Sequence, residues 1–113
     1  MDKNIILSRK LQNAVKQKFD GDLTFFLRNI VINGEKRGCS GFIRNNQNNT
    51  YVYVSTETIG FLPLGIGYLY RLADNEKDFT GYRNRYSDSL KNLVENITDL
   101  LNSSIAQEQD TRI

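Results

Sequence analysis

Apolar and polar residues alternate most clearly between residues 23 and 56, and this stretch predicts the centre of the fold. Two strand-like runs flank a middle run that can pair with both. Asn33 and Gly34 separate the first two runs, and both residues tolerate the positive φ that a two-residue hairpin turn requires. The polar run at residues 45–49 marks a second reversal, because asparagine side chains hydrogen-bond their own backbone in turns. The pattern predicts an antiparallel meander of three strands.

The first predicted strand, Leu23–Ile32, is apolar on both faces. One face carries Phe26, Ile30 and Ile32, whereas a strand with one solvated face alternates apolar and polar residues more regularly. We therefore expect this strand to be central in the sheet, with its second face covered. Residues 57–81 are the favoured cover, and a homodimer is the alternative.

The second predicted strand, residues 35–44, contains four small residues in a row at 38–41. Such a run predicts a bulge or the close approach of another backbone. The third predicted strand, residues 50–56, alternates valines with tyrosines. We expect the valines to face the helices, and Tyr51 and Tyr53 to face the other side of the sheet.

Apolar residues three and four apart predict a helix near each end of the chain. The first spans residues 4–19, with Asp2 or Asn4 as its cap. The second begins near residue 87 or 88 and ends near residue 102. Between the third strand and this helix the pattern is irregular, with a short fourth strand predicted at residues 68–72 and a solvated turn at residues 74–78.

These elements predict the α+β class: a three- to four-stranded antiparallel sheet with both helices on one face, in the order α-β-β-β-(β)-α. The 113 residues suit one domain over residues 1–104, with a flexible tail over residues 105–113. The N-terminal apolar run is too short for a signal peptide, and no run is long enough to span a bilayer. With a single cysteine, this composition leads us to expect a cytoplasmic protein.

The composition disfavours most catalytic chemistry. The chain has no histidine, so the common nucleophile–base pairs and zinc sites lack their usual ligand. Cys39 has no evident base and is expected to be a small packing residue. Acidic residues at 74, 76 and 78 match the start of a calcium loop, but Phe79 and Arg85 occupy the positions of its glycine and glutamate. We expect no enzyme activity, no catalytic residue, no metal and no cofactor.

The charge and the aromatic residues are unevenly distributed. Residues 1–44 hold nine Lys/Arg and four Asp/Glu, a net +5, whereas residues 45–113 hold six and nine, a net −3. All six tyrosines lie between Tyr51 and Tyr86, interleaved with arginines. Tyrosine and arginine dominate interface hot spots and also stack on unpaired bases, although half-buried packing explains the tyrosines equally well. The predicted binding residues are Arg37, Arg44, Tyr51, Tyr53, Arg71, Tyr82, Arg83 and Arg85.

Two resemblances add to this interpretation. The order of elements is similar to that of double-stranded-RNA-binding domains, although the second helix of those domains starts with lysines and residues 86–91 here are weakly acidic. The segments 37–43 (RGCSGFI) and 77–81 (KDFTG) resemble small accessory proteins of plasmids and phages of low-GC Gram-positive bacteria, over about half of the chain. Such proteins include anti-CRISPR factors, which inhibit a nuclease by occluding its surface.

Two functions follow as hypotheses. The first is a non-catalytic interaction protein, an inhibitor from a mobile element that binds a host protein or a nucleoprotein such as a CRISPR nuclease. The second is a nucleic-acid-binding module that uses the basic first helix and the first hairpin. The residues of this alternative face are Arg9, Lys10, Lys16 and Lys18.

Overall fold

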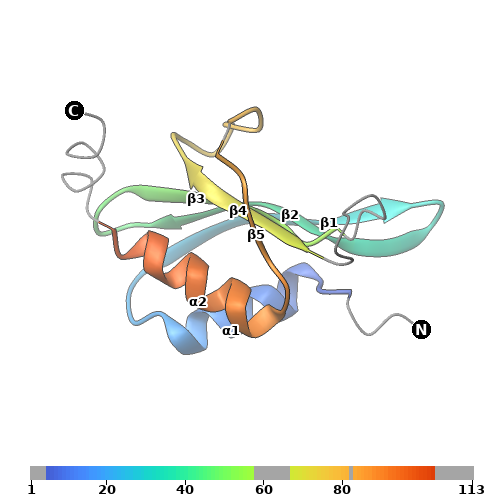
Figure 1. Cartoon of the computed structure of the whole chain (residues 1–113), viewed down its shortest axis with the longest axis horizontal. Coiled ribbons are helices and arrows are strands. Elements are labelled where there is room, and N and C mark those ends of the chain that lie inside the picture. The colour runs from blue at the N-terminus through green and yellow to red at the C-terminus, as the bar shows by residue number, and fades with distance from the viewer. Residues whose placement is uncertain (1–4, 58–66, 82, 104–113) are drawn as a thin grey trace.

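The computed structural model describes residues 5–57, 67–81 and 83–103. Within these ranges the strands form one antiparallel sheet in the order β1-β2-β3-β4-β5, and both helices pack on one face of it (Figure 1). The α+β class and the antiparallel meander are therefore confirmed. The elements are α1 (Ser8–Lys18), β1 (Leu23–Ile32), β2 (Glu35–Asn45), β3 (Thr50–Ser55), β4 (Tyr68–Ala73), β5 (Arg85–Ser87) and α2 (Leu90–Leu101).

The two helices begin later than the sequence predicts. The helix α1 starts at Ser8, and its N-cap residue, Leu7, makes no side-chain capping bond. The predicted caps lie outside the described residues, as do the predicted tail and residues 58–66. In α2 the cap is Ser89, whose hydroxyl accepts a hydrogen bond from the Asn92 N–H at 3.2 Å. The short strand β5 was not predicted, because three residues carry no readable alternation.

The expected central position of β1 was wrong, because β1 is an edge strand. The meander runs outward from β1 to β5, so β1 pairs with β2 alone. The described part of residues 57–81 does not fully cover the second face of β1, since Phe26 and Ile32 remain 39% and 41% exposed. The hairpin end of β1 and β2 projects past both helices, which leaves apolar residues on both of its faces in water (Figure 1).

The core lies between the two helices and the sheet. As predicted, Val52 and Val54 of β3 face this layer and are fully buried. They pack in one apolar cluster with residues of both helices, including Leu11 of α1 and Leu93 and Ile97 of α2. A side chain of this size contributes roughly 1.5–3 kcal/mol when it is fully buried, so this layer is the main source of stability.

The small residues at 38–41 fit against neighbouring backbone. The register shifts beside Gly38, opposite Ile30, which is the predicted bulge. A Cβ atom on Gly41 would overlap the Phe26 carbonyl oxygen, and one on Gly38 would lie 2.9 Å from the Thr56 carbonyl. Both glycines have φ in the left-handed region, at 154° and 144° for Gly38 and Gly41. The prediction of a close backbone approach is also confirmed.

Cys39 lies in the core beside these glycines. Its N–H donates to the Thr56 hydroxyl at 2.9 Å, and its carbonyl accepts from the Thr56 N–H at 2.8 Å. Burial raises the pKa of the Cys39 thiol above its ordinary value of 9.0, while a hydrogen bond from Thr56 acts in the opposite direction. A buried neutral thiol is a packing group and a poor nucleophile.

Candidate interaction face

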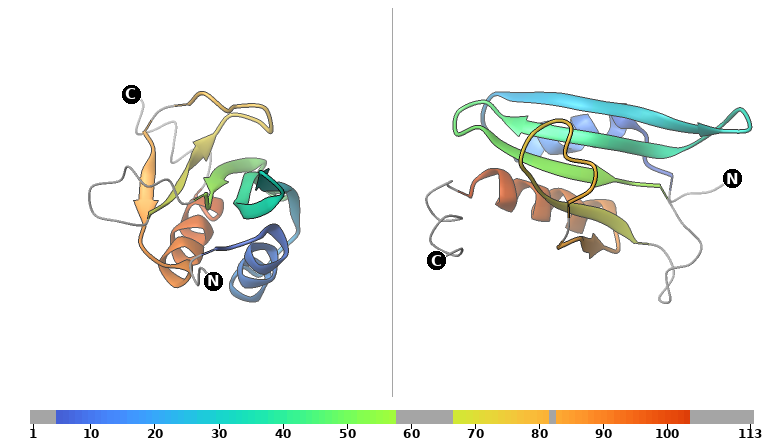
Figure 2. Two further views of the ribbon diagram at one scale, coloured as in Figure 1. Left: turned by 90° about the vertical axis from the view of Figure 1, so that its right-hand side faces the viewer. Right: turned by 90° about the horizontal axis from the view of Figure 1, so that it is seen from above.

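The face of the sheet opposite the helices carries four of the eight predicted binding residues. Strand register places Phe26, Phe42, Tyr53 and Arg71 in a row across β1 to β4. In the next row, Arg44 of β2 stands opposite Tyr51 of β3. Figure 2 shows the helices on one side of the sheet and the β4–β5 loop on the other. We call this side the open face.

The β4–β5 loop, described at residues 74–81 and 83–84, crosses the middle of the open face. Its residue Phe79 packs edge-on against Phe42 and Tyr53, with ring centroids 5.0 Å and 6.2 Å away. Phe42 is consequently only 1% exposed although it points away from the helices. The loop thus adds a second, smaller apolar cluster on the far side of the sheet.

Arg71 fastens this loop to β4. Its side chain is 2% exposed, and its Nη2 atom donates to the Asp78 carbonyl at 2.6 Å. Its Nη1 atom lies 3.4 Å from the Asp78 carboxylate and 3.2 Å from the Leu72 carbonyl, and the guanidinium stacks 4.6 Å above the Tyr53 ring. The Asp78 carboxylate also accepts the Asp74 N–H at 3.0 Å. Arg71 is therefore buried in an internal clamp and does not line an accessible surface.

The segment 77–81, which carried part of the sequence resemblance, supplies the other half of this clamp. Asp78 and Phe79 make the contacts described above, and Gly81 lies against the Arg71 guanidinium. A Cβ atom on Gly81 would overlap the Arg71 Nη1 atom. Because Arg71 is buried and hydrogen-bonded, it has little room to move aside. Through these contacts, segment 77–81 anchors the β4–β5 loop to the sheet.

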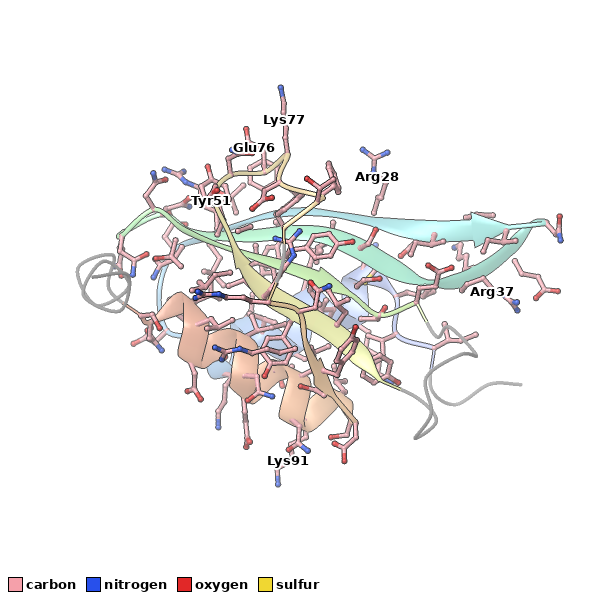
Figure 3. All side chains as sticks on the ribbon, turned by 45° about the horizontal axis from the view of Figure 1, so that its top comes forward. Arg28, Arg37, Tyr51, Glu76, Lys77 and Lys91 are labelled. Carbon is pink, nitrogen blue, oxygen red and sulfur yellow. The ribbon has the colours of Figure 1, made fainter. Side chains whose placement is uncertain are left out.

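Beside the clamp, an accessible group of side chains remains, which we call the aromatic–arginine face: Phe26, Arg44 and Tyr51. The rings of Phe26 and Tyr51 stack with centroids 6.4 Å apart and planes at 30°. The Arg44 guanidinium lies 5.9 Å from the Tyr51 ring. Arg44 is held by the side-chain oxygens of Asn46 and Asn49, each at 2.8 Å, so it is positioned by neutral partners that do not cancel its charge. Figure 3 shows Tyr51 on this side of the molecule, with Arg28 farther along the same side.

The other predicted binding residues do not join this face. Arg37 lies at the projecting hairpin end, 3.4 Å from Glu35 (Figure 3). Arg83 and Arg85 are exposed at the β5 side of the molecule, and Tyr82 lies outside the described residues. Phe26 was expected to be covered and was not counted as a binding residue. It belongs to the face because the β1–β2 and β2–β3 registers bring it near Tyr51, and a linear pattern does not record that proximity.

The alternative basic surface lies on the opposite side of the molecule, in the helix layer. All four cations predicted for it are exposed, and α1 contains no acidic residue. Lys16 leans toward β1, with its Nζ atom 5.5 Å from the centre of the Phe25 ring. The structure therefore separates the two candidate surfaces, and each can be altered without touching the other.

Chemical features of the described residues complete the description. Burial raises the pKa of the Tyr53 phenol above its ordinary value of 10.0; Arg71 opposes this shift and Glu57 adds to it. The described ranges contain no group of three acidic or cysteine side chains placed to hold a metal ion. None of the helices described is long and apolar enough to cross a membrane.

Comparisons with known protein families, curated proteins and solved structures gave no match.

Proposed function

We propose that this chain is a non-catalytic interaction protein that binds a protein target through its aromatic–arginine face. The observation that carries the proposal is the stacked pair of rings, exposed Phe26 and half-buried Tyr51, with the Arg44 guanidinium fixed beside them. Aromatic rings offer a large contact area at a small entropic cost, and arginine adds directional donors. The three side chains lie on β1, β2 and β3, which are consecutive strands of one sheet, so little ordering is needed when a partner binds.

The mode of action that we propose is inhibition by occlusion. A small rigid protein that lacks its own chemistry acts on a target by covering a surface that the target needs. The resemblance to anti-CRISPR factors of mobile elements names the first class of target to test, a CRISPR nuclease bound to its guide RNA. The identity of the target stays a prediction from that resemblance.

Binding to purified CRISPR nuclease–guide complexes and inhibition of their DNA cleavage test the proposal. We expect the double variant Arg44→Ala/Tyr51→Ala to weaken binding by about 2 kcal/mol or more, the usual loss at an interface anchor. Its matched control is Lys10→Glu/Lys18→Glu, which changes exposed residues of the helix layer. The proposal is abandoned if the first variant binds every tested complex as tightly as the unmodified protein while the control loses binding.

One observation favours nucleic-acid binding as a second candidate function. The helix α1 presents four exposed cations and no acidic residue, which suits contacts with phosphates. Against it, residues 86–91, which lead into α2, hold one lysine, Lys91, where a double-stranded-RNA-binding domain has several. A salt titration with a duplex RNA separates the candidates, because phosphate contacts give an affinity that falls linearly with salt on logarithmic axes. If α1 contacts phosphates, Lys10→Glu/Lys18→Glu should reduce the slope of affinity against salt on these axes. Arg44→Ala/Tyr51→Ala should leave that slope unchanged.

A further inference from the structure

The outer side of β1 presents unpaired main chain. Backbone groups of a strand point alternately to its two neighbours, and the Phe26 carbonyl lies against Gly41 of β2. Residues of β1 with even numbers therefore direct their N–H and C=O groups to β2. Between residues that the structure describes, no hydrogen bond outside the β1–β2 ladder engages the β1 main chain. The residues whose main-chain groups point outward are Leu23, Phe25, Leu27, Asn29 and Val31.

This edge carries few of the features that usually block strand addition. Soluble proteins protect edges with short strands, prolines or several charges. The strand β1 is ten residues long, contains no proline and has one charged residue, Arg28. Apolar side chains at its hairpin end are exposed, with Val31 at 56% and Ile32 at 41%. The opposite edge strand, β5, is only three residues long, so its short length protects it from strand addition.

Cations flank the middle of this edge in both layers of the molecule. Arg28 projects from the open face, as Figure 3 shows. On the helix side, Lys16 lies over Phe25, and Arg9 follows Ser8, whose N–H donates to the Asn29 side chain at 2.8 Å. A strand laid along β1 would therefore have positive charge on both of its sides.

Among the described residues, the acidic residues closest to β1 in the sequence stand at its two ends. Asp20 and Asp22 precede the strand, and Glu35 follows the turn. A second copy paired antiparallel to β1 would bring its own Arg9 and Lys16 beside those of the first copy, which is repulsive. The charge pattern thus favours an acidic occupant over a second copy of the chain.

We propose that the β1 edge binds an extended acidic peptide segment of the partner protein, which adds a sixth strand to the sheet. Main-chain hydrogen bonds to the outward groups of β1 supply affinity, and alternate side chains supply specificity. Glutamate or aspartate at neighbouring positions would meet Arg28 on one side and Lys16 on the other, and apolar residues would pack on Val31 and Ile32. This inference rests on the proposal that the target is a protein, but it uses the outward main chain of β1, whereas the aromatic–arginine face uses side chains of β1, β2 and β3.

A synthetic peptide, acetyl-TVEEVTVEEV-amide, is the probe, and amide hydrogen exchange measured by NMR is the readout. In the free protein, the odd-numbered amides of β1 should exchange fast and the even-numbered amides slowly. When the peptide binds, the odd-numbered amides should slow by about tenfold or more, while the even-numbered amides change little. Generic attraction of an acidic peptide to a basic protein would not produce this alternation.

Two control peptides and three protein variants sharpen the test. A peptide with lysine for each glutamate, and one N-methylated at alternate residues, should each bind about tenfold more weakly or worse. The double variant Lys16→Glu/Arg28→Glu should lose binding to a similar degree, whereas Lys91→Glu, on the exposed side of α2, should not. Arg44→Ala/Tyr51→Ala should bind the probe normally, so failure of the aromatic–arginine proposal and failure of this one give different results.

Two outcomes overturn the inference. The first is an absence of slowing at the odd-numbered amides of β1 with millimolar peptide. The second is slowing of the same amides with rising protein concentration and no peptide, which would assign the edge to a second copy of the chain.

Discussion

At the scale of single residues, the closest fit between strands is at Gly41. A Cβ atom there would overlap the Phe26 carbonyl, and the residue has a φ of 144°. We predict that Gly41→Ala destabilises the protein by more than about 2 kcal/mol in urea unfolding, because it adds a clash to backbone strain of roughly 1–3 kcal/mol. Gly34→Ala is the matched control, since Gly34 has a φ of 80° with no atom within 4 Å of the added Cβ. Equal losses for the two variants would show that the Gly41 clash is relieved by small movements.

The buried Cys39 thiol and the half-buried Tyr53 phenol make the fold sensitive to alkaline pH. Folding raises the pKa of the Cys39 thiol and the Tyr53 phenol, mainly by burial. The folded state therefore holds these protons more tightly than the unfolded state, so stability is constant below the unfolded pKa values and falls as pH rises above about 9. Urea unfolding at pH 7, 9 and 10 should show this loss. Cys39→Ala should reduce the loss between pH 9 and 10, and an identical pH profile in that variant would contradict the assignment to the thiol.

At the scale of elements, the Arg71–Asp78 clamp decides whether the β4–β5 loop stays on the sheet. Asp78→Ala leaves the Arg71 guanidinium buried with carbonyl oxygens as its only described hydrogen-bond acceptors. We predict a loss of about 2–4 kcal/mol, below the upper range for a buried ion pair because Asp78 is 19% exposed. Amide exchange at residues 74–81 should accelerate in step. Asp74→Ala, at an exposed residue of the same loop, should cost less than about half a kcal/mol.

The sequence predicted which residues form helices and strands better than it predicted which strands lie side by side. The turn at Asn33 and Gly34 and the period of two in β3 are local signals, so the meander and the buried side of the sheet could be inferred directly. The edge position of β1 could not be inferred, because the sequence pattern of an apolar strand is the same whether a strand, a loop or water lies beside it. Phe26 illustrates this, since its exposure follows from the order of the strands.

The same limit explains the candidate site. Arg44 and Tyr51 were predicted and lie together, because both are set by strand pairing across one short turn. Arg71 was also predicted as a binding residue, but a loop that begins three residues later folds back and buries it. No local pattern announces that contact. The sequence pattern therefore predicted on which side of the sheet Tyr51 and Tyr53 lie, but it did not predict that Arg71 is buried.

At the scale of the whole molecule, both helices and the sheet share one apolar core, so they should unfold together. Leu93 and Ile97 of α2 are fully buried among residues of α1 and the sheet. We predict that Leu93→Ala and Ile97→Ala each cost about 2–5 kcal/mol. The chain has no tryptophan, so tyrosine fluorescence reports mainly on the sheet, whereas far-UV circular dichroism reports mainly on the helices.

In urea the two signals should give coincident transitions, and each core variant should shift both midpoints equally with an unchanged slope. Cooperative unfolding is expected because neither helix has another apolar surface on which to remain folded once the sheet opens. A helical signal that survives after the tyrosine transition would show that α1 and α2 form a separate unit. A loss below about half a kcal/mol at both positions would show that the side chains of Leu93 and Ile97 face solvent, which would contradict the packing described above.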